Sequence, residues 1–214
     1  MGHKINSNAM RMGISKTWKS RWYKQGPEYI KFLHEDKKLR DLVRKELSAA
    51  GIDRVEISRT VGACEVNVYV ARPGVAIGRG GAGIETITKK LKKVVDTNIE
   101  LKVSEVKKPD MSASIIAAEI ASGLLRRMPP KLLAMNAIEK AKASGAKGIR
   151  IWVSGRINGA SQARTIKHHD GPVPLHTLKA NIDFAKDVAE THDLGKFGIK
   201  VWVYRPESAE TESR

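Results

Sequence analysis

Hydrophobic residues first recur with the period of a helix in the segment that follows residue 38. Leu39, Leu42, Val43 and Leu47 fall on one helical face, and Gly51 stands where such a helix would end. This spacing predicts an amphipathic helix that buries one side against the rest of a domain.

Three later segments alternate between apolar and polar residues, which predicts strands. The second strand faces its apolar residues one way and Glu65 and Asn67 the other. Between the second and third strands, an apolar stripe opposite a group of lysines predicts another helix. The apolar positions are Val55 and Ile57; Cys64, Val66, Val68 and Val70; Ile84, Ile87, Leu91 and Val94; and Ile99, Leu101 and Val103.

The second half of the chain begins with helical patterns and continues with alternating ones. Pro129-Pro130 separates the two helical segments, because proline is tolerated at a helix start but not inside one. We therefore expect two helices beside an antiparallel sheet. The predicted helices cover residues 111–128 and 131–144, and the predicted strands cover 149–153, 161–168 and 199–203.

Residues 179–192 are ambiguous. Ile182, Ala185 and Ala189 suit a helix, whereas a hairpin with the final strand would need a strand in this segment. Local pattern alone does not choose between the two.

Charge narrows the class of partner. The chain has 39 Lys and Arg against 23 Asp and Glu, a formal net charge of +16, which favours a polyanionic partner such as nucleic acid or an anionic membrane. The excess is +6 over residues 1–38 (nine bases, three acids), +5 over 39–109 (fourteen, nine) and +5 over 110–214 (sixteen, eleven). No apolar run approaches a membrane span, and the single Cys64 forms no internal disulfide, so we expect a soluble chain from a reducing compartment.

The first 27 residues contain no acidic residue and read as a basic arm. Their lysines and arginines suit phosphates, and Trp18, Trp22 and Tyr23 suit stacking on bases. Two alternatives stay open: the tryptophans pack on the following domain, or the segment is an organelle-targeting peptide. Gly13 and Gly26-Pro27 disfavour the targeting peptide, because they interrupt the helix that it would need.

A glycine cluster at residues 78–83 carries the most information. Gly78, Gly80 and Gly83 satisfy the dinucleotide-binding spacing, but the preceding strand alternates and Pro73-Gly74 intervene, unlike a buried parallel strand. A second interpretation is a helix start whose glycines allow close packing. The third is the GXXG loop of a KH domain, whose glycines let an RNA backbone approach amides at a helix N-terminus. The order of elements favours the KH loop, formed by Gly78, Arg79, Gly80 and Gly81.

Residues typical of enzymes and metal sites are present without the required spacing. His168, His169, His176 and His192 have no second cysteine and no metal-binding motif beside them. Ser154, Asp170 and His176 include the residue types of a catalytic triad, but nothing places them together. We therefore predict no catalytic site, no cofactor and no metal.

Motifs along nearly the whole chain resemble one family, the third protein of the bacterial small ribosomal subunit. The strongest is the C-terminal signature, which begins at Val153-Ser154-Gly155-Arg156 and continues through residues 173–183. The start of the chain, the loop from Ala71 to Gly78 and the final strand from Gly198 to Trp202 are also similar to that family. All of these motifs occur in family order.

The resemblance implies a type II KH domain with a three-stranded sheet and helices on one face, followed by two helices packed on an antiparallel sheet. It also implies a cytoplasmic protein of the ribosome, with an organellar ribosome as the less favoured alternative. The implied partners are small-subunit (16S-type) ribosomal RNA, neighbouring proteins of the subunit head, and messenger RNA where it enters; no membrane is implied. A free-standing KH regulator and a nucleotide-dependent oxidoreductase are the rival functions.

The family's basic patch on the second helix pair is associated with holding and unwinding incoming messenger. Arg126, Arg127 and Lys131 match it here, whereas Leu132, Met135 and Asn136 stand where the family is usually basic. Each missing cation removes one potential phosphate contact, so we predict weakened unwinding.

The sequence therefore predicts four segments and three groups of RNA-binding residues. For each lysine or arginine, a solvated surface charge is the alternative. The segments are a basic arm (1–27), a KH domain (28–109), a C-terminal α+β domain (110–206) and an acidic flexible tail (207–214). The residues predicted to bind single-stranded RNA are Gly78, Arg79, Gly80 and Gly81, and those predicted to bind messenger are Arg126, Arg127 and Lys131. The residues predicted to bind ribosomal RNA phosphates are Lys4, Arg11, Arg150, Arg156 and Arg164.

Overall fold

A computed structural model of the chain describes residues 4–60, 62–95 and 98–206. These residues form two compact units: residues 18–109 make one, and residues 4–17 join residues 110–206 in the other. The predicted arm is therefore divided between the units, and the division at residue 17 differs from the boundary expected at residue 27. The predicted acidic tail lies outside the described residues.

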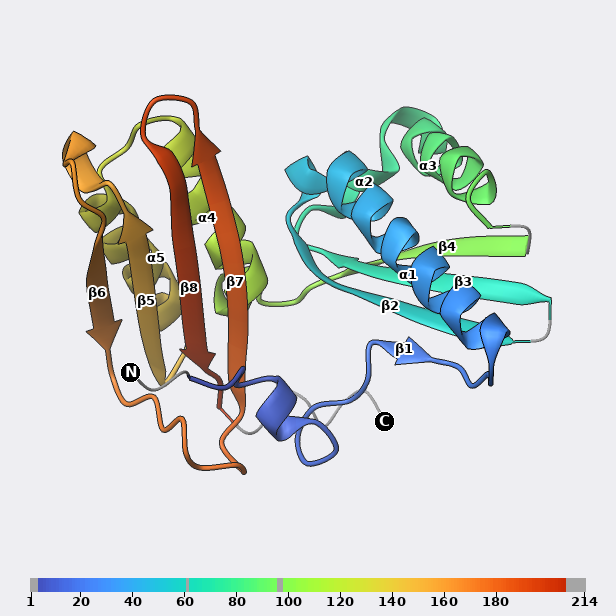
Figure 1. Ribbon diagram of the computed structural model, residues 1–214, viewed down its shortest axis with the longest axis horizontal. Helices are drawn as coiled ribbons and strands as arrows, with labels where there is room; N and C mark the ends of the chain where they lie inside the picture. Colours follow the sequence, from blue (N-terminus) through green and yellow to red (C-terminus); the bar gives the residue numbers. More distant parts are fainter. Residues whose placement is uncertain (1–3, 61, 96–97, 207–214) are drawn as a thin grey trace. The chain divides into compact units, whose positions relative to one another are not determined.

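The unit of residues 18–109 is a sheet with helices on one face (Figure 1). Its order of helix, strand, strand, glycine loop, helix and strand is the predicted KH order, and a short additional strand, β1, runs parallel to β2 at the edge. The sheet order is β1-β2-β3-β4, with β2 and β3 antiparallel and β3 and β4 parallel. The elements are β1 (Ser20–Arg21), α1 (Pro27–Glu46), β2 (Ile52–Thr60), β3 (Ala63–Val70), α2 (Pro73–Ile77), α3 (Ala82–Lys92) and β4 (Asn98–Glu105).

The alternating pattern of this unit produces its core. Ile57 pairs with Val66, and Val66 with Leu101, so the apolar residues of three strands share one face. Leu39 of α1 and Leu91 of α3 pack on that face and are fully buried. Each such side chain contributes about 1.5–3 kcal/mol by leaving water.

Part of the predicted arm is fastened to this unit by a buried charge network. Arg59 of β2 donates hydrogen bonds to Glu35 and Asp36 of α1, each with a shortest distance of 2.7 Å. The Trp22 indole N–H donates to the same Asp36 at 2.8 Å, and its ring packs edge-on against Phe32. Trp22 therefore packs on the following domain, whereas Trp18 is 67% exposed.

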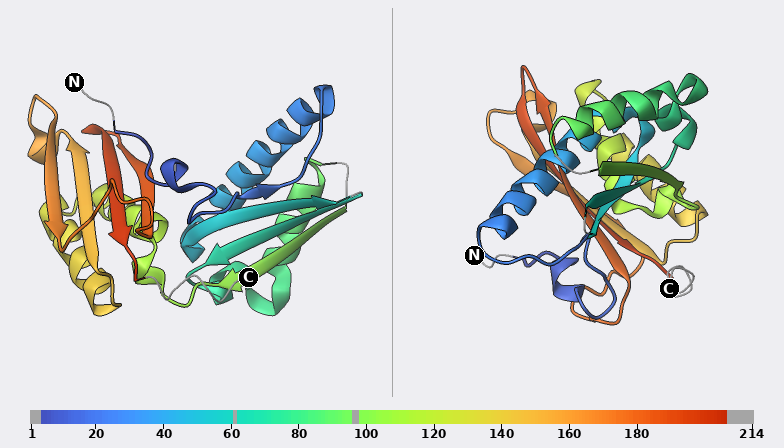
Figure 2. Two further views of the ribbon diagram at one scale, coloured as in Figure 1. Left: turned by 90° about the horizontal axis from the view of Figure 1, so that it is seen from below. Right: turned by 90° about the vertical axis from the view of Figure 1, so that its right-hand side faces the viewer.

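The other unit has two helices against one face of a four-stranded antiparallel sheet (Figures 1 and 2). The strand order is β6-β5-β8-β7, and Ile151, Val153 and Ile199 face the helices. The Ser112 hydroxyl caps the N-terminus of α4 by accepting a hydrogen bond from the backbone N–H of Ile115. The elements are α4 (Ala113–Leu125), α5 (Pro130–Ala143), β5 (Gly148–Gly155), β6 (Arg164–Asp170), β7 (Ile182–Thr191) and β8 (Gly195–Tyr204).

The ambiguous segment 179–192 contains the strand β7, which forms the hairpin with β8. Ala185 and Ala189 face the helices, whereas Ile182 faces the opposite side with Trp202. The apparent helical spacing arises because the two faces of this strand are buried in two different apolar clusters.

The face of this sheet opposite the helices is partly covered by residues 4–17. The Trp202 indole N–H donates to the Ser7 hydroxyl at 3.2 Å. The side-chain amide of Asn8 donates to the Phe184 carbonyl at 2.7 Å and accepts the Phe184 amide at 3.2 Å. Because β7 is an edge strand, Asn8 satisfies backbone groups that would otherwise be open to pairing.

Candidate nucleic-acid interface

The glycine loop between α2 and α3 requires glycine at several positions. Gly78, Gly80 and Gly81 have φ angles of +70°, +62° and +85°, a region that other L residues rarely adopt. A Cβ atom built on Gly80 or Gly81 would meet nothing within 4 Å. These two glycines therefore provide the backbone conformation and leave the outer side of the loop open.

The other two glycines of the cluster serve close packing. A Cβ atom on Gly83 would lie 2.7 Å from the Ala76 carbonyl and 2.8 Å from the Ile77 carbonyl, and one on Gly78 would lie 3.2 Å from the Gly83 nitrogen. Close packing thus accounts for Gly83 and contributes at Gly78, whereas Gly80 and Gly81 are the open positions of the predicted RNA loop.

Both ends of helix α3 carry groups that can attract phosphate: backbone N–H groups at its start and lysine side chains at its end. The first turn of a helix leaves backbone N–H groups unpaired, and these attract phosphate. Lys89, Lys92 and Lys93 are exposed near its other end, while Ile87 and Leu91 are buried against the sheet. The backbone of Arg79 lies in the loop; its side chain is outside the description.

The turn between α4 and α5 projects the predicted messenger-binding cations. The Arg127 amide donates to Leu124 and the Met128 amide to Gly123, which is a Schellman helix ending with Arg127 in the left-handed position. Arg127 has a φ of +60°, although glycine is usual there. This geometry costs stability and exposes the side chain, which forms an ion pair with Asp193 at the surface.

The neutral positions in the first turns of α5 are also exposed. Leu132 is 47% and Met135 is 44% exposed, and Asn136 is also exposed, next to Arg126 and Lys131 in the chain. The three residues that stand where the resemblance implies cations are therefore all at the surface.

Arg11 is a correction to the predicted set. Its side chain is fully buried and donates hydrogen bonds to backbone carbonyls of residues 7 and 174–180, at 2.8 Å to Ala180 and 2.9 Å to Thr177. A guanidinium enclosed in this way does not reach a phosphate. Arg11 holds the N-terminal segment on the sheet instead.

Arg156 and Arg164 flank the loop between β5 and β6 and are both exposed. The Nε of Arg156 donates to the Ala160 carbonyl at 2.9 Å, which orders the loop and leaves the rest of the guanidinium available. The loop between β5 and β6, which belongs to the C-terminal signature and which we call the signature loop, thus has an exposed arginine at each end.

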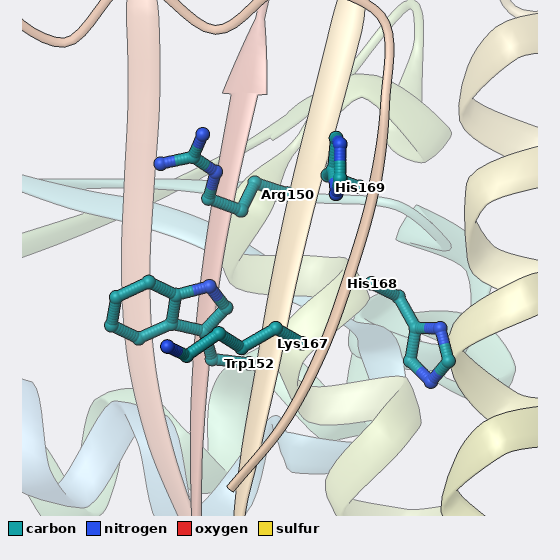
Figure 3. Close-up of a pocket in the computed structure, with 5 residues that line it drawn as sticks. All are labelled: Arg150, Trp152, Lys167, His168 and His169. Carbon is teal, nitrogen blue, oxygen red and sulfur yellow. The ribbon is translucent and has the colours of Figure 1, made fainter.

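Lys4 and Arg150 lie on the face of the C-terminal sheet opposite the helices. The Lys4 ammonium lies 4.4 Å from the centroid of the Trp152 ring, and Trp202 packs edge-on against Trp152 with the ring centroids 5.0 Å apart. A shallow pocket of about 360 Å³ is lined by Arg150, Trp152 and Lys167, with His168 and His169. Figure 3 shows Arg150, Trp152 and Lys167 extending to one side of the strand pair and His168 to the other.

Other chemistry is sparse among the described residues. Cys64 is buried, and burial raises the pKa of its thiol, which lowers its reactivity. Residues 4–60, 62–95 and 98–206 contain no cluster of three or more His, Cys, Asp or Glu suited to a metal. No helix in those ranges is long and apolar enough to cross a membrane.

Comparisons with known proteins identify the family. Residues 38–111 match the family model of the KH domain, and residues 120–203 match that of the ribosomal protein S3 C-terminal domain. The chain is 44% identical to the small ribosomal subunit protein uS3 of Gluconobacter oxydans over 207 residues, 97% of this chain and 91% of that protein. The chain belongs to the uS3 family.

Further uS3 relatives show the same extent of similarity. The protein of Parvibaculum lavamentivorans is 43% identical over 98% of this chain and 89% of its own length. That of Acetivibrio thermocellus is 43% identical over 97% and 91%, respectively. The uS3 family is structural and non-enzymatic, so the oxidoreductase interpretation of the glycine cluster is excluded, and the prediction of a KH domain is confirmed.

Proposed function

We propose that this chain is a structural component of the small-subunit head in cytoplasmic ribosomes. There it binds small-subunit ribosomal RNA and neighbouring head proteins and helps form the channel through which messenger RNA enters. Membership of the uS3 family over nearly the whole chain supports this role. The observation that carries the RNA-binding part is the glycine loop, open on its outer side at the start of α3.

The proposed RNA-contacting residues divide into three groups by position. Lys4, Arg150, Arg156 and Arg164 contact ribosomal RNA phosphates from the C-terminal sheet and its signature loop. Arg126, Arg127 and Lys131 contact messenger RNA from the α4–α5 turn, and Gly78, Arg79, Gly80 and Gly81 contact single-stranded RNA. Phosphate contacts of this kind supply affinity without sequence preference.

Sedimentation tests the ribosomal role. In a lysate of cells that express the tagged chain, we expect it to co-migrate with small subunits and whole ribosomes on a sucrose gradient. A free-standing KH regulator would bind RNA but stay at the top of the gradient. Absence of the chain from the subunit fractions would contradict the proposed function.

A pair of glycine substitutions tests the loop. Gly80→Asp puts a negative charge and a side chain where a phosphate chain approaches, so we expect affinity for single-stranded RNA to fall about tenfold. Gly62→Asp is the matched control, because Gly62 also has a positive φ and open space around a Cβ atom, but lies in the β2–β3 turn. Equal affinities of the two variants would assign the loop a structural role only.

Restoring a cation tests the messenger path. We expect ribosomes that carry Met135→Lys to translate through a stable messenger hairpin faster than wild-type ribosomes, because the exposed position gains a phosphate contact. The control is Lys142→Met, which removes an exposed lysine near the other end of the same helix. Unchanged speed in Met135→Lys ribosomes would place this turn away from the messenger.

A further inference from the structure

The register of the C-terminal sheet aligns three lysines and one tryptophan across all four strands. Lys167 of β6 pairs with Trp152 of β5, Trp152 with Lys200 of β8, and Lys200 with Lys186 of β7. All four residues point away from the helices, because their neighbours Ile151, Val153 and Val201 face the core. We call this set the lysine row.

Two more cations border the lysine row. Arg150 precedes Trp152 by two residues on the same face, and Lys4 approaches from the N-terminal segment. The Nζ atoms of Lys4 and Lys167 lie 4.4 Å and 5.0 Å from the centroid of the Trp152 ring. The ring therefore orients two ammonium groups by cation–π attraction.

Within the part of the chain that the structure describes, these five cations lack ion-pair partners. No carboxylate of the described ranges forms an ion pair with Lys4, Arg150, Lys167, Lys186 or Lys200, whereas eight other lysines do have such partners. Partial burial, followed by repulsion from Arg150, Lys167 and Lys200, lowers the pKa of Lys4. Lys186 and Lys200 stand directly opposite each other, an arrangement of like charges that destabilises a sheet.

We propose that the lysine row, with Arg150 and Lys4, is a second binding surface for a single RNA strand, separate from the glycine loop and the α4–α5 turn. The proposal rests on the proposed ribosomal function and deepens it, because it adds Lys167, Lys186, Lys200 and Trp152 to the contacts. The phosphates lie along the row, and Trp152 acts as a positioning residue for the lysines.

The dimensions and composition of the surface favour RNA over an acidic protein. Three spacings between neighbouring strands span roughly 14 Å, a length over which a nucleic-acid strand presents several phosphates. A positively charged surface that can follow a phosphate backbone is typical of proteins that bind single strands. The Trp152 ring within the row is half-buried. Among the described residues of this sheet face, no carboxylate forms an ion pair with a lysine of the row.

A triple variant tests the surface in the full-length chain, with a labelled oligouridylate as the probe. We expect Lys167→Ala/Lys186→Ala/Lys200→Ala to reduce the slope of log affinity against log salt by about 2, since each single-strand phosphate contact contributes about 0.7. Affinity near 0.1 M salt then falls ten- to a hundredfold.

The matched control removes the same charge from the same unit. Lys140, Lys142 and Lys196 are exposed but form ion pairs with Glu119, Asp170 and Glu190. We expect Lys140→Ala/Lys142→Ala/Lys196→Ala to change affinity less than threefold. Equal losses in the two triple variants would overturn the proposal, because the effect would then reflect total charge alone.

Tryptophan emission locates the contact. Oligouridylate bound along the row changes the fluorescence of Trp152, so Trp152→Phe should remove most of the signal while it retains most of the affinity through its own ring. An unchanged signal in Trp152→Phe would overturn the proposal. Trp152→Leu should lower affinity further than Trp152→Phe, since it no longer orients the lysines.

The outcome separates this proposal from the function on which it rests. If the lysine-row variant keeps its RNA affinity and still co-sediments with subunits, the surface proposal fails and the ribosomal function stands. If it keeps its RNA affinity but no longer joins subunits, the row binds a protein neighbour, and the proposal is again overturned. If the wild-type chain does not join subunits at all, the ribosomal function fails first.

Discussion

The two sheets of the molecule differ in how the central cations are paired on the faces that helices do not cover, although Lys196 at the end of the C-terminal sheet also pairs with Glu190. In the KH sheet, Arg54 pairs with Asp53 and Glu56 at 3.0 and 2.8 Å, and Lys102 pairs with Glu65 at 2.6 Å. In the C-terminal sheet, the lysine row has no carboxylate partner among the described residues.

This difference shows that the net charge of a segment does not tell which of its cations lack a carboxylate partner. Residues 39–109 carry an excess of +5, yet their sheet face is closed by its own ion pairs. The basic character of that unit is carried by the glycine loop and α3 instead. An ion pair with a carboxylate contributes slightly to the stability of the fold. Two lysines directly opposite each other on neighbouring strands lower it, and an external anion would relieve their repulsion.

The largest expected effect concerns Arg11, a buried cation that holds the N-terminal segment on the C-terminal sheet. We expect Arg11→Met to lower the free energy of unfolding by about 3–5 kcal/mol, because several buried carbonyls lose their donor. Denaturant unfolding followed by Trp202 fluorescence measures it. Arg156→Met, at an exposed site, should stay within about 0.5 kcal/mol. Equal effects would contradict the assignment of Arg11 to the core.

Arg127 tests whether an exposed cation is kept at a cost to stability. Arg127→Gly should raise the free energy of unfolding by about 1 kcal/mol, because glycine relieves the left-handed backbone. Arg127→Ala is the control: it loses the same charge but keeps the strain. We expect both variants to bind RNA equally weakly, measured by fluorescence anisotropy. A glycine variant no more stable than the alanine variant would refute the strain.

Lys186→Glu replaces the like-charge pair Lys186–Lys200 with a cross-strand ion pair, as Lys102 and Glu65 form in the KH sheet. We expect a gain of about 0.5 kcal/mol in thermal unfolding, since Lys200 then faces a carboxylate. RNA affinity should fall at the same time. Increased affinity would show that the two sheet faces do not differ in the way inferred.

The smallest effect is expected on the KH sheet. Lys102→Ala breaks an exposed ion pair with Glu65, which should cost less than about 0.5 kcal/mol. RNA affinity should stay within twofold of wild type in the same anisotropy titration. A tenfold loss would mean that this face also contacts RNA and would remove the contrast between the sheets.

Much of the fold follows from local patterns. Strands β3, β5 and β8 bury one side each, so period-two alternation locates them, and Pro129-Pro130 marks the boundary between α4 and α5. Strand β7 escapes this reasoning, because Ile182 and Ala189 are buried on opposite faces. Its identity depends on β8 and on the cover from the N-terminal segment.

The candidate site divides in the same way. The glycine loop is local, because a few consecutive residues set its backbone. The glycine motif together with the order of the surrounding elements was therefore sufficient to predict it. Arg11 was misassigned because a cation in a basic segment looks available, and only the folded chain brings the carbonyls of residues 174–180 around it. The residues next to Arg11 in the chain do not mark it as buried, although Arg156 was favoured because it lies within the C-terminal signature.

The sequence by itself determined the fold class, the KH loop and the uS3 family, because each depends on residues close together in the chain or on motifs in fixed order. Tertiary structure alone decided which cations are buried, which are paired and which stand in one row. Lys167, Lys186 and Lys200 come from three strands, and their alignment depends on the register of those strands. Register is a property of the whole sheet, since it is set by how both faces are buried.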